Sequence, residues 1–500
     1  MVQRSLSVLV PSRSLLVVVS ALLLAGSISA QSAQSGATPA GKTYYVSSSG
    51  NDASSGLAPF HAWSSVARVN RQVLEPGDRV LFAAGEVFPG TIVLGKDESG
   101  TPEEMITFAS FGDGRAEIRA GNGTGFDLVD VAGIRISNLF VSGSGFETNE
   151  GIGISFFTAL PGDVKLSSIR VDGCRVSGFR SGGISIGSRK GRSGFQDVRV
   201  DHCRLDHDGD DGMKVWGSYD PTWGQAIEDY AHRSIYIAHN VFESNWGDPR
   251  RTTTHTGSGC VVAQAAGVLI EHNEALDNGG LNSFKGGGPV GLWLWDVLYG
   301  VMQYNESHHN KSATIDGGGF DLDGGTRSCL MQYNYSHDND GAGFMMYQFA
   351  KGARPMVDVT ARYNVSRRDG GRGGSGALQL WNDDRVGPPI TGARFHDNHV
   401  TVEAKSAGVP RAFRVTGSGG VTRSNFSDNV FVARGASVWL GEVTLSPAPE
   451  WKGNYFLADA GAFVLHDGGV TYSSLDAWIK ATGHERYQGV FRRGCRTIRC

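Results

Sequence analysis

The sequence predicts an all-β chain that is coiled into a parallel β-helix of about ten or more turns. The first observation is internal repetition: an alternating apolar strand runs into an Asn or a Cys, and a second short strand follows, at intervals of 25 to 37 residues. The second is glycine, which at 71 of 500 residues is well above its usual share and indicates many turns. The residues that recur at the equivalent position are Cys174, Cys203, Asn240, Asn273, Asn305, Asn334, Asn364, Asn398, Asn429 and Asn454. We expect the asparagine amides to stack as an inward ladder, one from each turn.

The N-terminal segment has the pattern of a secretory signal. Residues 1–30 hold Arg4 and Arg13, followed by an apolar run and then small residues. Residues 31–42 are expected to be a linker, and no later apolar run reaches the roughly 20 residues that a bilayer requires. The sequence therefore predicts a secreted or periplasmic protein, which we expect to be a monomer. A net charge of −4 gives no reason to expect nucleic acid or a membrane as a partner.

The predicted β-helix spans residues 43–490. Both of its ends need a cover, because an open coil would expose apolar core and unpaired strand edges. At the first end, Val66, Val69 and Val73 lie at helical spacing and predict a short capping helix. At the other end, residues 474–500 predict a small C-terminal cap.

The chain contains six cysteines, and an exported protein can form disulfides. Cys495 and Cys500, in "GCRTIRC", are the expected pair, because a short loop there would fix the end of the chain. The other four lie inside strand-like runs and predict buried thiols: Cys174, Cys203, Cys260 and Cys329.

The opening and closing segments carry a resemblance to a known superfamily. The predicted β-helix opens with "TYYVSSSGNDASSGLAPFHAWSSVARVN" and closes with "SSLDAWIKATGHE". Together with the repeats, these segments resemble the right-handed parallel β-helix superfamily of secreted carbohydrate-active proteins, the pectin-lyase-like fold, over about residues 43–490. The resemblance implies a single right-handed coil and a polysaccharide or oligosaccharide as partner. Because the superfamily includes lyases, hydrolases, epimerases and adhesins, it does not select one reaction.

After each ladder residue, a few polar residues lead to a strand with apolar residues at alternate positions. If these apolar side chains point inward, the residues between them point outward and form a stripe along the coil. The inward pairs are Ile184/Ile186, Met213/Val215, Leu292/Leu294, Phe320/Leu322, Phe344/Met346, Leu378/Leu380 and Phe413/Val415. The outward residues are Lys214/Trp216, Trp293/Trp295, Asp321/Asp323, Met345/Tyr347, Gln379/Trp381 and Arg414.

Two carboxylates, Asp321 and Asp323, lie at the centre of this stripe, on a strand that we expect to be exposed. Hydrolysis of a glycosidic bond uses a carboxylic acid that protonates the leaving oxygen and a carboxylate that activates water or attacks carbon. Repulsion within the pair should raise one of the two pKa values and so supply an acid and a base. Their Cβ atoms would lie about 6.6 Å apart, at the border between retaining and inverting spacing and closer to inverting. Asp316, in the turn before the strand, is the alternative partner for either residue.

Aromatic side chains on both sides of the aspartates predict a groove that binds sugar rings. The aromatic candidates for substrate binding are Trp293, Trp295, Tyr347 and Trp381. The further candidates are His308, His337, Asp340 and Lys285. The two histidines occupy equivalent places in adjacent turns, where they either orient the substrate or form a stacked polar ladder along a corner of the coil. Asp340 precedes a glycine, so turn formation is an alternative role for it.

Two other functions stay open at this point. In calcium-dependent pectate-lyase-type β-helices, carboxylates bind Ca²⁺ while a Lys or Arg abstracts a proton from a uronate sugar. The carboxylates for that alternative are Asp208, Asp210 and Asp211, and the candidate bases are Lys214, Lys285, Arg368 and Arg372. The third function is glycan binding without turnover. The hydrolase needs no cofactor, and the acidic centre of the groove favours a neutral sugar.

Overall fold

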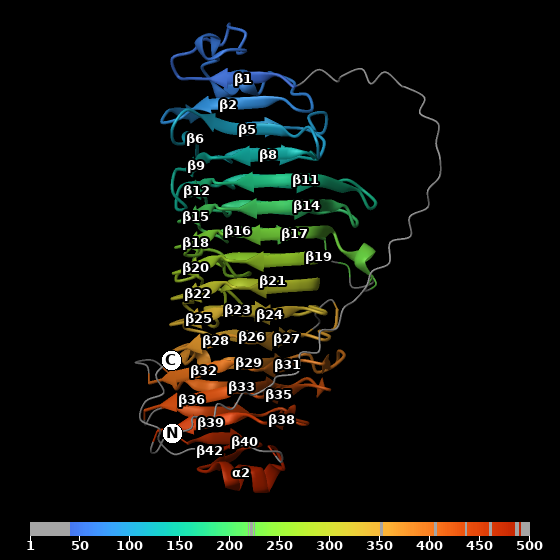
Figure 1. The fold of residues 1–500 in the computed structure, drawn as a ribbon, viewed down its shortest axis with the longest axis vertical. Helices are drawn as coiled ribbons and strands as arrows, with labels where there is room; N and C mark the ends of the chain where they lie inside the picture. Colours follow the sequence, from blue (N-terminus) through green and yellow to red (C-terminus); the bar gives the residue numbers. More distant parts are fainter. Residues whose placement is uncertain are drawn as a thin grey trace, which may run out of the picture. The chain divides into compact units, whose positions relative to one another are not determined.

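The computed structural model describes residues 41–218, 220, 224, 226–350, 354–404, 408–435, 438–459, 463–485 and 490–491. These residues form a right-handed parallel β-helix of about 11 turns with very few helices, as the repeats predict (Figure 1). The expected signal sequence, most of the expected linker, and the predicted pair Cys495 and Cys500 lie outside the described residues. No helix among the described residues is long and apolar enough to cross a membrane.

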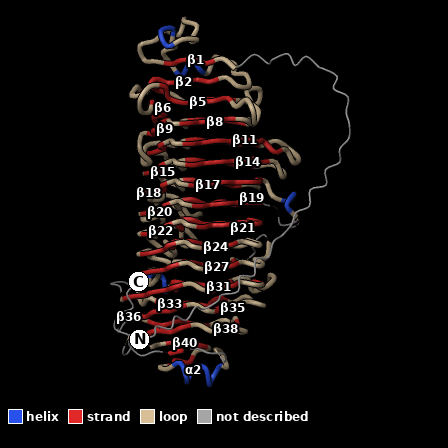
Figure 2. The backbone as a smooth tube through the Cα atoms, viewed as in Figure 1, coloured by secondary structure: helices blue, strands red, loops and turns tan. Residues whose placement is uncertain are grey.

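Each turn of the coil contributes strands to three faces, which we call the first, second and third faces (Figure 2). The first face consists of β4 (Ile92–Leu94), β7 (Phe126–Val129), β10 (Ile154–Thr158), β13 (Ile184–Ser188), β16 (Met213–Trp216), the first halves of β19 (Cys260–Glu271) and β21 (Val290–Gln303), β23 (Gly318–Leu322), β26 (Phe344–Gln348), β29 (Gly376–Asn382), β33 (Arg411–Gly417), β37 (Trp439–Val443) and β40 (Leu465–Asp467). The second face consists of β1 (Thr43–Val46), β2 (Arg79–Ala83), β5 (Ile106–Phe111), β8 (Ile134–Ser137), β11 (Lys165–Asp172), β14 (Gly194–Asp201), β17 (His232–Ala238), the second halves of β19 and β21, β24 (Leu330–Gln332), β27 (Thr360–Arg362), β31 (Arg394–His396), β35 (Asn425–Ser427) and β38 (Glu450–Lys452). The third face consists of β3 (Val87–Pro89), β6 (Ala116–Gly121), β9 (Leu139–Gly143), β12 (Arg175–Ser177), β15 (Arg204–Asp206), β18 (Val241–Glu243), β20 (Glu274–Leu276), β22 (Glu306–His308), β25 (Tyr335–His337), β28 (Val365–Arg367), β32 (His399–Glu403), β36 (Val430–Arg434), β39 (Tyr455–Ala458) and β42 (Val490–Phe491).

The first and second faces join into one 26-stranded sheet because β19 and β21 run through the corner between them. The third face is a separate 14-stranded sheet. Strands of successive turns pair in parallel, and the short strand β41 (Val470–Tyr472) adds one antiparallel pairing at the C-terminal end. The remaining elements are small: the strand pair β30 (Ile390–Thr391) and β34 (Val421–Thr422), and the single turns η1 (Pro59–His61), η2 (Ile227–Asp229) and η3 (Arg372–Gly374).

The core of the coil is filled by the alternate apolar residues of the strands. All seven inward pairs that the sequence predicts on the first face are fully buried. Inward rings of adjacent turns stack on one another, as Phe320 and Phe344 do with ring centres 5.0 Å apart. The four cysteines that lie in strand-like runs are buried free thiols, as predicted. Alternation on the strands therefore fixes which side chains face out on the first face.

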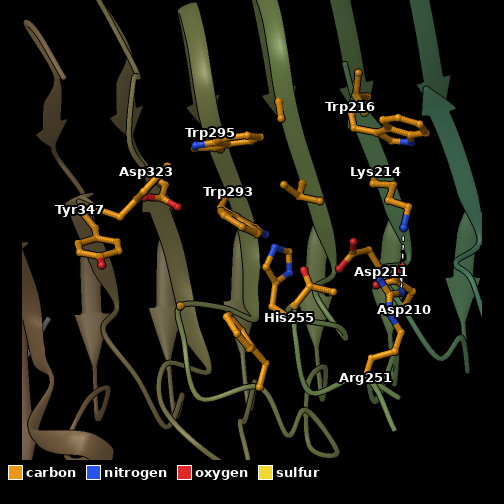
Figure 3. Close-up of a pocket in the computed structure, with 17 residues that line it drawn as sticks. Asp210, Asp211, Lys214, Trp216, Arg251, His255, Trp293, Trp295, Asp323 and Tyr347 are labelled. Carbon is orange, nitrogen blue, oxygen red and sulfur yellow. Dashed lines mark hydrogen bonds and ion pairs between the residues drawn. The ribbon is translucent and has the colours of Figure 1, made fainter. Parts of the chain in front are cut away.

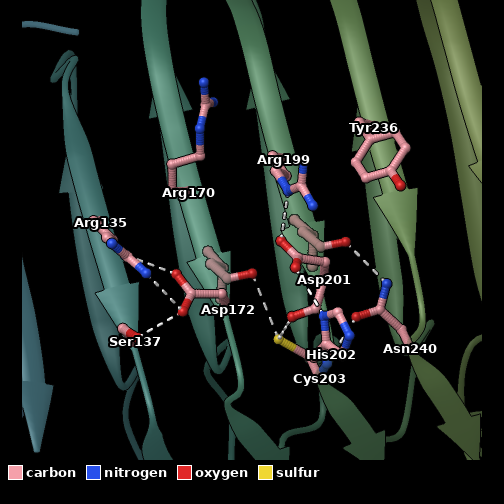
Figure 4. Close-up of polar contacts among 12 residues, drawn as sticks. Arg135, Ser137, Arg170, Asp172, Arg199, Asp201, His202, Cys203, Tyr236 and Asn240 are labelled. Atoms are coloured by element: carbon pink, nitrogen blue, oxygen red, sulfur yellow. Dashed lines mark hydrogen bonds and ion pairs between the residues drawn. The ribbon is translucent and has the colours of Figure 1, made fainter. Parts of the chain in front are cut away.

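The predicted asparagine ladder is confirmed between the second and third faces. The side-chain amide of each ladder residue from Asn240 to Asn429 donates to the amide oxygen of the next, over 2.9 to 3.1 Å. The ladder starts at a cysteine, where Cys203 N–H donates to Asn240 Oδ1 over 2.9 Å (Figure 4). Asn305, Asn334 and Asn364 lie on successive turns, as the spacing predicts.

A second ladder, which the sequence analysis did not predict, lies between the third and first faces. Its members are Asn245, Asn278, Asn310, Asn339 and Asp369, with amide-to-oxygen distances of 2.9 to 3.0 Å. Asp208 occupies the same position one turn earlier, where its N–H donates to Asn245 Oδ1 over 3.2 Å. Its Oδ1 accepts the N–H of Phe179 over 2.7 Å. Asp208 is therefore part of the wall of the coil.

The N-terminal end is covered by α1 (Val66–Val69), a single helical turn. Ser65 caps it, because its hydroxyl accepts the N–H of Arg68 over 3.1 Å. Val66 and Val69 are buried, but Val73 is 66% exposed. The expectation that all three valines cover the core is wrong for Val73, because the helix ends at Val69 and the chain leaves the core there.

The C-terminal end of the coil is closed by α2 (Leu475–Thr482). Trp478 of this helix is fully buried, with its ring edge-on to Trp451 and Phe456 of the last turns. The helix ends at Gly483, whose φ of 72° suits a glycine at that position.

Candidate active site

A cavity of about 510 Å³ lies over the first face, above β16, β19, β21 and β26 (Figure 3). Outward side chains of these strands form its floor. Loops that precede β19 and β21 and a segment that follows β26 form its walls. The wall residues include Arg251, Thr254, His255, Phe284, Gly287 and Phe349. These loops turn part of the predicted groove into a walled cavity.

The outward stripe has the predicted order. Paired strands place Lys214, Val261, Trp293, Asp321, Met345, Gln379 and Arg414 in one row. A second row runs beside it through Ala263, Trp295, Tyr347 and Trp381. Asp323 continues the register next to Trp295, because its N–H donates to the carbonyl of Leu294 over 2.8 Å. The register of the strands therefore brings the two aspartates next to the two tryptophans of the adjacent turn.

Of the three predicted catalytic carboxylates, only Asp323 lines the cavity, and Asp316 and Asp321 lie close enough to interact with it electrostatically. Asp323 is half-buried and lines the cavity, whereas Asp321 is 2% exposed. Asp316, in the turn before β23, is 8% exposed, and its Oδ2 accepts the N–H of Gly288 over 2.5 Å. The expectation of an exposed strand is wrong: Asp321 points away from the core, but it lies between Trp293 and Met345 of the adjacent turns, which are also buried.

Burial shifts the pKa values of these carboxyl groups upward. It raises the pKa of Asp316 to about 6, although the Gly288 N–H opposes the shift. Burial also raises the pKa of Asp323 to about 8. The hydrogen bond from the Gly324 N–H lowers this pKa, and the charge of Asp316 raises it further. Burial and then the charges of Asp323 and Asp316 hold the pKa of Asp321 well above its usual range. Near neutral pH the cluster therefore contains both a carboxylate and carboxylic acids.

Aromatic rings lie on both sides of Asp323 in the cavity: Trp293 and Trp295 lie between it and Lys214, and Tyr347 lies on its other side (Figure 3). Trp293 is 5% exposed, and its Nε1–H donates to Ser258 Oγ over 3.1 Å. Trp295 is half-buried, with its ring centre 6.2 Å from that of Phe349. Tyr347 lines the cavity and contacts Trp381, which lies behind it with ring centres 4.8 Å apart. Trp295 and Tyr347 thus offer rings to the cavity, whereas Trp293 is almost fully buried in its floor.

The opposite end of the cavity is an ion-paired cluster. Asp210 Oδ2 contacts Lys214 Nζ at 2.5 Å and Arg251 Nη1 at 2.7 Å. Burial lowers the pKa of Lys214, but the charges of Asp210 and Asp211 outweigh it and leave the pKa above its usual value. Burial and the charge of Asp210 raise the pKa of Asp211 to about 7, while its Oδ1 accepts the N–H of Ser258 over 3.0 Å. This end therefore offers charged and neutral hydrogen-bonding groups to a polar ligand.

The three carboxylates of the calcium alternative do not fit one ion. Asp208 belongs to the second ladder, and two cationic side chains already neutralise Asp210. Among the described residues, Asp208, Asp210 and Asp211 do not form a group whose oxygens gather within reach of a single metal. This arrangement gives no support to a single Ca²⁺ site at these residues.

His255 is a cavity residue that the sequence analysis missed. It lies in the loop before β19, half-buried at the cavity, with its ring 4.9 Å from that of Trp293. Burial lowers its pKa to about 4, so the ring is neutral at neutral pH. Its Nδ1 has no hydrogen-bond partner within the described part of the chain. A single histidine in a polar loop carries no periodic signal, so only the folded loop shows its position.

Four predicted substrate-binding residues lie away from the cavity. His308 and His337 are in β22 and β25 of the third face, where their rings stack with centres 4.6 Å apart. The stacked-ladder alternative is therefore the one observed. Lys285 is exposed on the loop before β21, and Asp340 pairs with Arg372 at 3.0 Å; neither lines the cavity.

Comparisons with known proteins agree with the architecture. A family model described as a right handed beta helix region matches residues 163–351. A lacto-N-biosidase from Bifidobacterium longum subsp. longum is 25% identical over 508 residues, which cover 82% of this chain; this chain spans 30% of that protein. Among solved structures, the GH136 lacto-N-biosidase from Eubacterium ramulus, in native and selenomethionine forms, matches with a TM-score of 0.58 at 22% identity. That match covers 78% of this chain and 67% of the other, and it establishes a shared fold.

Proposed function

We propose that this protein is a glycoside hydrolase of the lacto-N-biosidase type, which cleaves a neutral oligosaccharide in the cavity of the first face. The observation that carries the proposal is a group of three neighbouring carboxyl groups with raised pKa values, of which Asp323 lines a cavity that also contains aromatic rings. The likeness to two lacto-N-biosidases supports it. We further propose that the protein is secreted as a monomer, on the basis of residues 1–30.

In this proposal Asp323 is the general acid. It lines the cavity, and a pKa of about 8 keeps it protonated at neutral pH, so it can donate a proton to the glycosidic oxygen. Asp316, with a pKa of about 6, is then the ionised partner that attacks the anomeric carbon or activates the water. Asp321 stays neutral beneath them and limits the negative charge of the cluster. Water supplies the hydroxyl group of the new reducing end.

The lyase alternative lacks a suitable base. Lys214 is ion-paired with Asp210 and its pKa is raised, which makes it a poor proton acceptor. Arg368 and Arg372 are paired with aspartates, and Lys285 lies outside the cavity. Assays with p-nitrophenyl lacto-N-bioside and a panel of neutral oligosaccharides and uronates, each with and without EDTA, test the choice. We expect reducing ends without an unsaturated uronate and without an effect of EDTA. If neither reducing ends nor an unsaturated uronate formed with any member of the panel, the protein would be one that binds a glycan without cleaving it.

The rate of hydrolysis should follow a bell-shaped pH profile. Activity rises with pH through about 6, because Asp316 must lose its proton, and falls through about 8, because Asp323 must keep its proton. The measurement is kcat/KM on p-nitrophenyl lacto-N-bioside across this range. In Asp316→Asn any residual activity should lose the acidic limb and keep the basic one. A flat profile for the wild type would contradict the assignment of both roles.

Trp295→Ala should weaken substrate binding. Contact of a sugar with an aromatic face is worth on the order of 1 to 3 kcal/mol, so KM should rise at least several-fold while kcat changes less. Trp439→Ala is the matched control, because Trp439 is a half-buried tryptophan on the same face that does not line the cavity. An unchanged KM in a folded Trp295→Ala protein would place the sugar elsewhere.

A further inference from the structure

Three histidines come together on the third face, away from the cavity. His308 and His337 face each other across the paired strands β22 and β25, with their ring planes 6° apart. His309 follows β22 in the left-handed conformation, with a φ of 55°, which turns its ring edge-on to both of the others. One ring nitrogen from each histidine lies within 4.8 Å of the other two.

The Nε2 atoms of the two strand histidines, His308 and His337, each contact a glutamate carboxylate. His308 Nε2 lies 3.2 Å from Glu274 Oε1, and His337 Nε2 lies 3.0 Å from Glu306 Oε1. Each glutamate comes from the strand one turn earlier, so the contact repeats along the face. A hydrogen bond from His308 Nε2–H to Glu274 leaves His308 Nδ1 with a lone pair, whereas the Nδ1–H of His337 donates to Asp338 Oδ2 and would lose its proton on binding a metal. This arrangement is typical of histidines that bind metals, whose other ring nitrogen donates to a carboxylate.

The Nδ1 side of the same histidines faces further ligand atoms. His308 Nδ1 lies 2.7 Å from His309 Nδ1, a hydrogen bond in which the ring of one histidine donates its proton to the lone pair of the other. His337 Nδ1 lies 2.8 Å from Asp338 Oδ2. Asp338 is fixed by Arg368, which donates to both of its oxygens over 2.6 Å. Three nitrogens and one carboxylate oxygen are therefore close to one region of the surface.

We propose that His308, His309 and His337, with Asp338 as a fourth ligand, form a binding site for a divalent transition-metal ion of the zinc type. Zinc takes four ligands at about 2.0 to 2.2 Å from nitrogen and oxygen, so ligand atoms lie about 3.3 Å apart around it. The four groups reach that spacing through small side-chain rotations, because they already lie within 2.7 to 4.8 Å of their neighbours. The metal would link the turns that contain β22 and β25. The site does not depend on the proposed hydrolase activity.

Zinc titration of tag-free protein, stripped with EDTA and dialysed, tests the site. By isothermal titration calorimetry we expect one zinc ion per chain in the wild type. His309→Asn should bind zinc at least 10-fold more weakly. Asparagine tolerates the left-handed conformation, and His309 is exposed, so the fold is retained. Zinc should also raise the unfolding temperature of the wild type but not that of His309→Asn.

The matched control is His396→Asn. His396 also sits beside an aspartate, with its Nδ1 2.8 Å from Asp397 Oδ2, but no described group of metal-ligating residues contains it. This variant should bind zinc as the wild type does. The proposal would be overturned if His309→Asn kept wild-type affinity, if His396→Asn lost zinc as His309→Asn does, or if the wild type bound none at millimolar zinc.

Discussion

Asp323→Asn is expected to lower kcat by a factor of 10² to 10⁴, because the amide cannot donate the proton that the leaving oxygen requires. Asp316→Asn should lose a comparable factor, since it removes the ionised partner. Asp321→Asn should lose less than either, because an amide replaces a carboxyl group that burial already keeps neutral. The measurement is kcat on p-nitrophenyl lacto-N-bioside, with the unfolding temperature of each variant recorded alongside.

Asp340→Asn is the matched control for these variants. Asp340 lies one turn further along the coil and pairs with Arg372 without lining the cavity, so its substitution should leave kcat unchanged. Full activity in both Asp323→Asn and Asp316→Asn would remove the hydrolase assignment from this strand. If the variants lost unfolding temperature and activity together, and EDTA reproduced the loss in the wild type, a structural cation would explain the cluster better.

Asn334→Ala is expected to destabilise the coil by about 3 to 5 kcal/mol, because it leaves several buried polar groups without partners at about 1 to 3 kcal/mol each. The amide of Asn334 donates to the carbonyl of Met302 over 2.9 Å and to Asn364 Oδ1 over 3.1 Å. Its oxygen accepts both the backbone and side-chain N–H groups of Asn305 over 3.0 Å. A lower midpoint of urea denaturation, followed by circular dichroism, would report the loss.

Asn425→Ala is the control for the ladder. Asn425 is half-buried on β35, outside both ladders, so its substitution should change stability by no more than about 0.5 kcal/mol. Equal midpoints for Asn334→Ala and Asn425→Ala would show that the ladder adds little to stability.

The coil and the stripe of outward residues could be predicted because both follow from strict periods. A ladder residue recurs once per turn, and alternation of period two on the first face separates Phe320 and Leu322 from Asp321. The once-per-turn repeat could also have predicted the second ladder. Its members stand five residues after the first-ladder asparagines from Asn240 to Asn364, as Asn278 follows Asn273 and Asn310 follows Asn305.

The walls of the cavity could not be predicted, because they come from loops without a period. Arg251 reaches Asp210 across 41 residues of sequence, and neither the length nor the composition of the intervening segments indicates that contact. The burial of Asp321 could not be predicted either, since alternation on the strand indicates only that this side chain points away from the core. The positions of His308 and His337, by contrast, could have been predicted from the sequence. Each stands three residues after a ladder asparagine, and the strand that directly follows the ladder lies on the third face and not on the first.

The two asparagine ladders also act as rows of aligned dipoles. In each side-chain bond between two ladder asparagines, the amide N–H of one points to the oxygen of the next in chain order, so the positive ends of the amides face the C-terminal end of the coil. Aligned amide dipoles add, as they do along an α-helix. Both rows end at a carboxylate: Asn454 donates to Glu485, and Asn339 donates to Asp369. Two unrelated parts of the chain thus place an acidic side chain where the electrostatic potential of the row is most positive, as acidic residues do at the N-terminus of a helix.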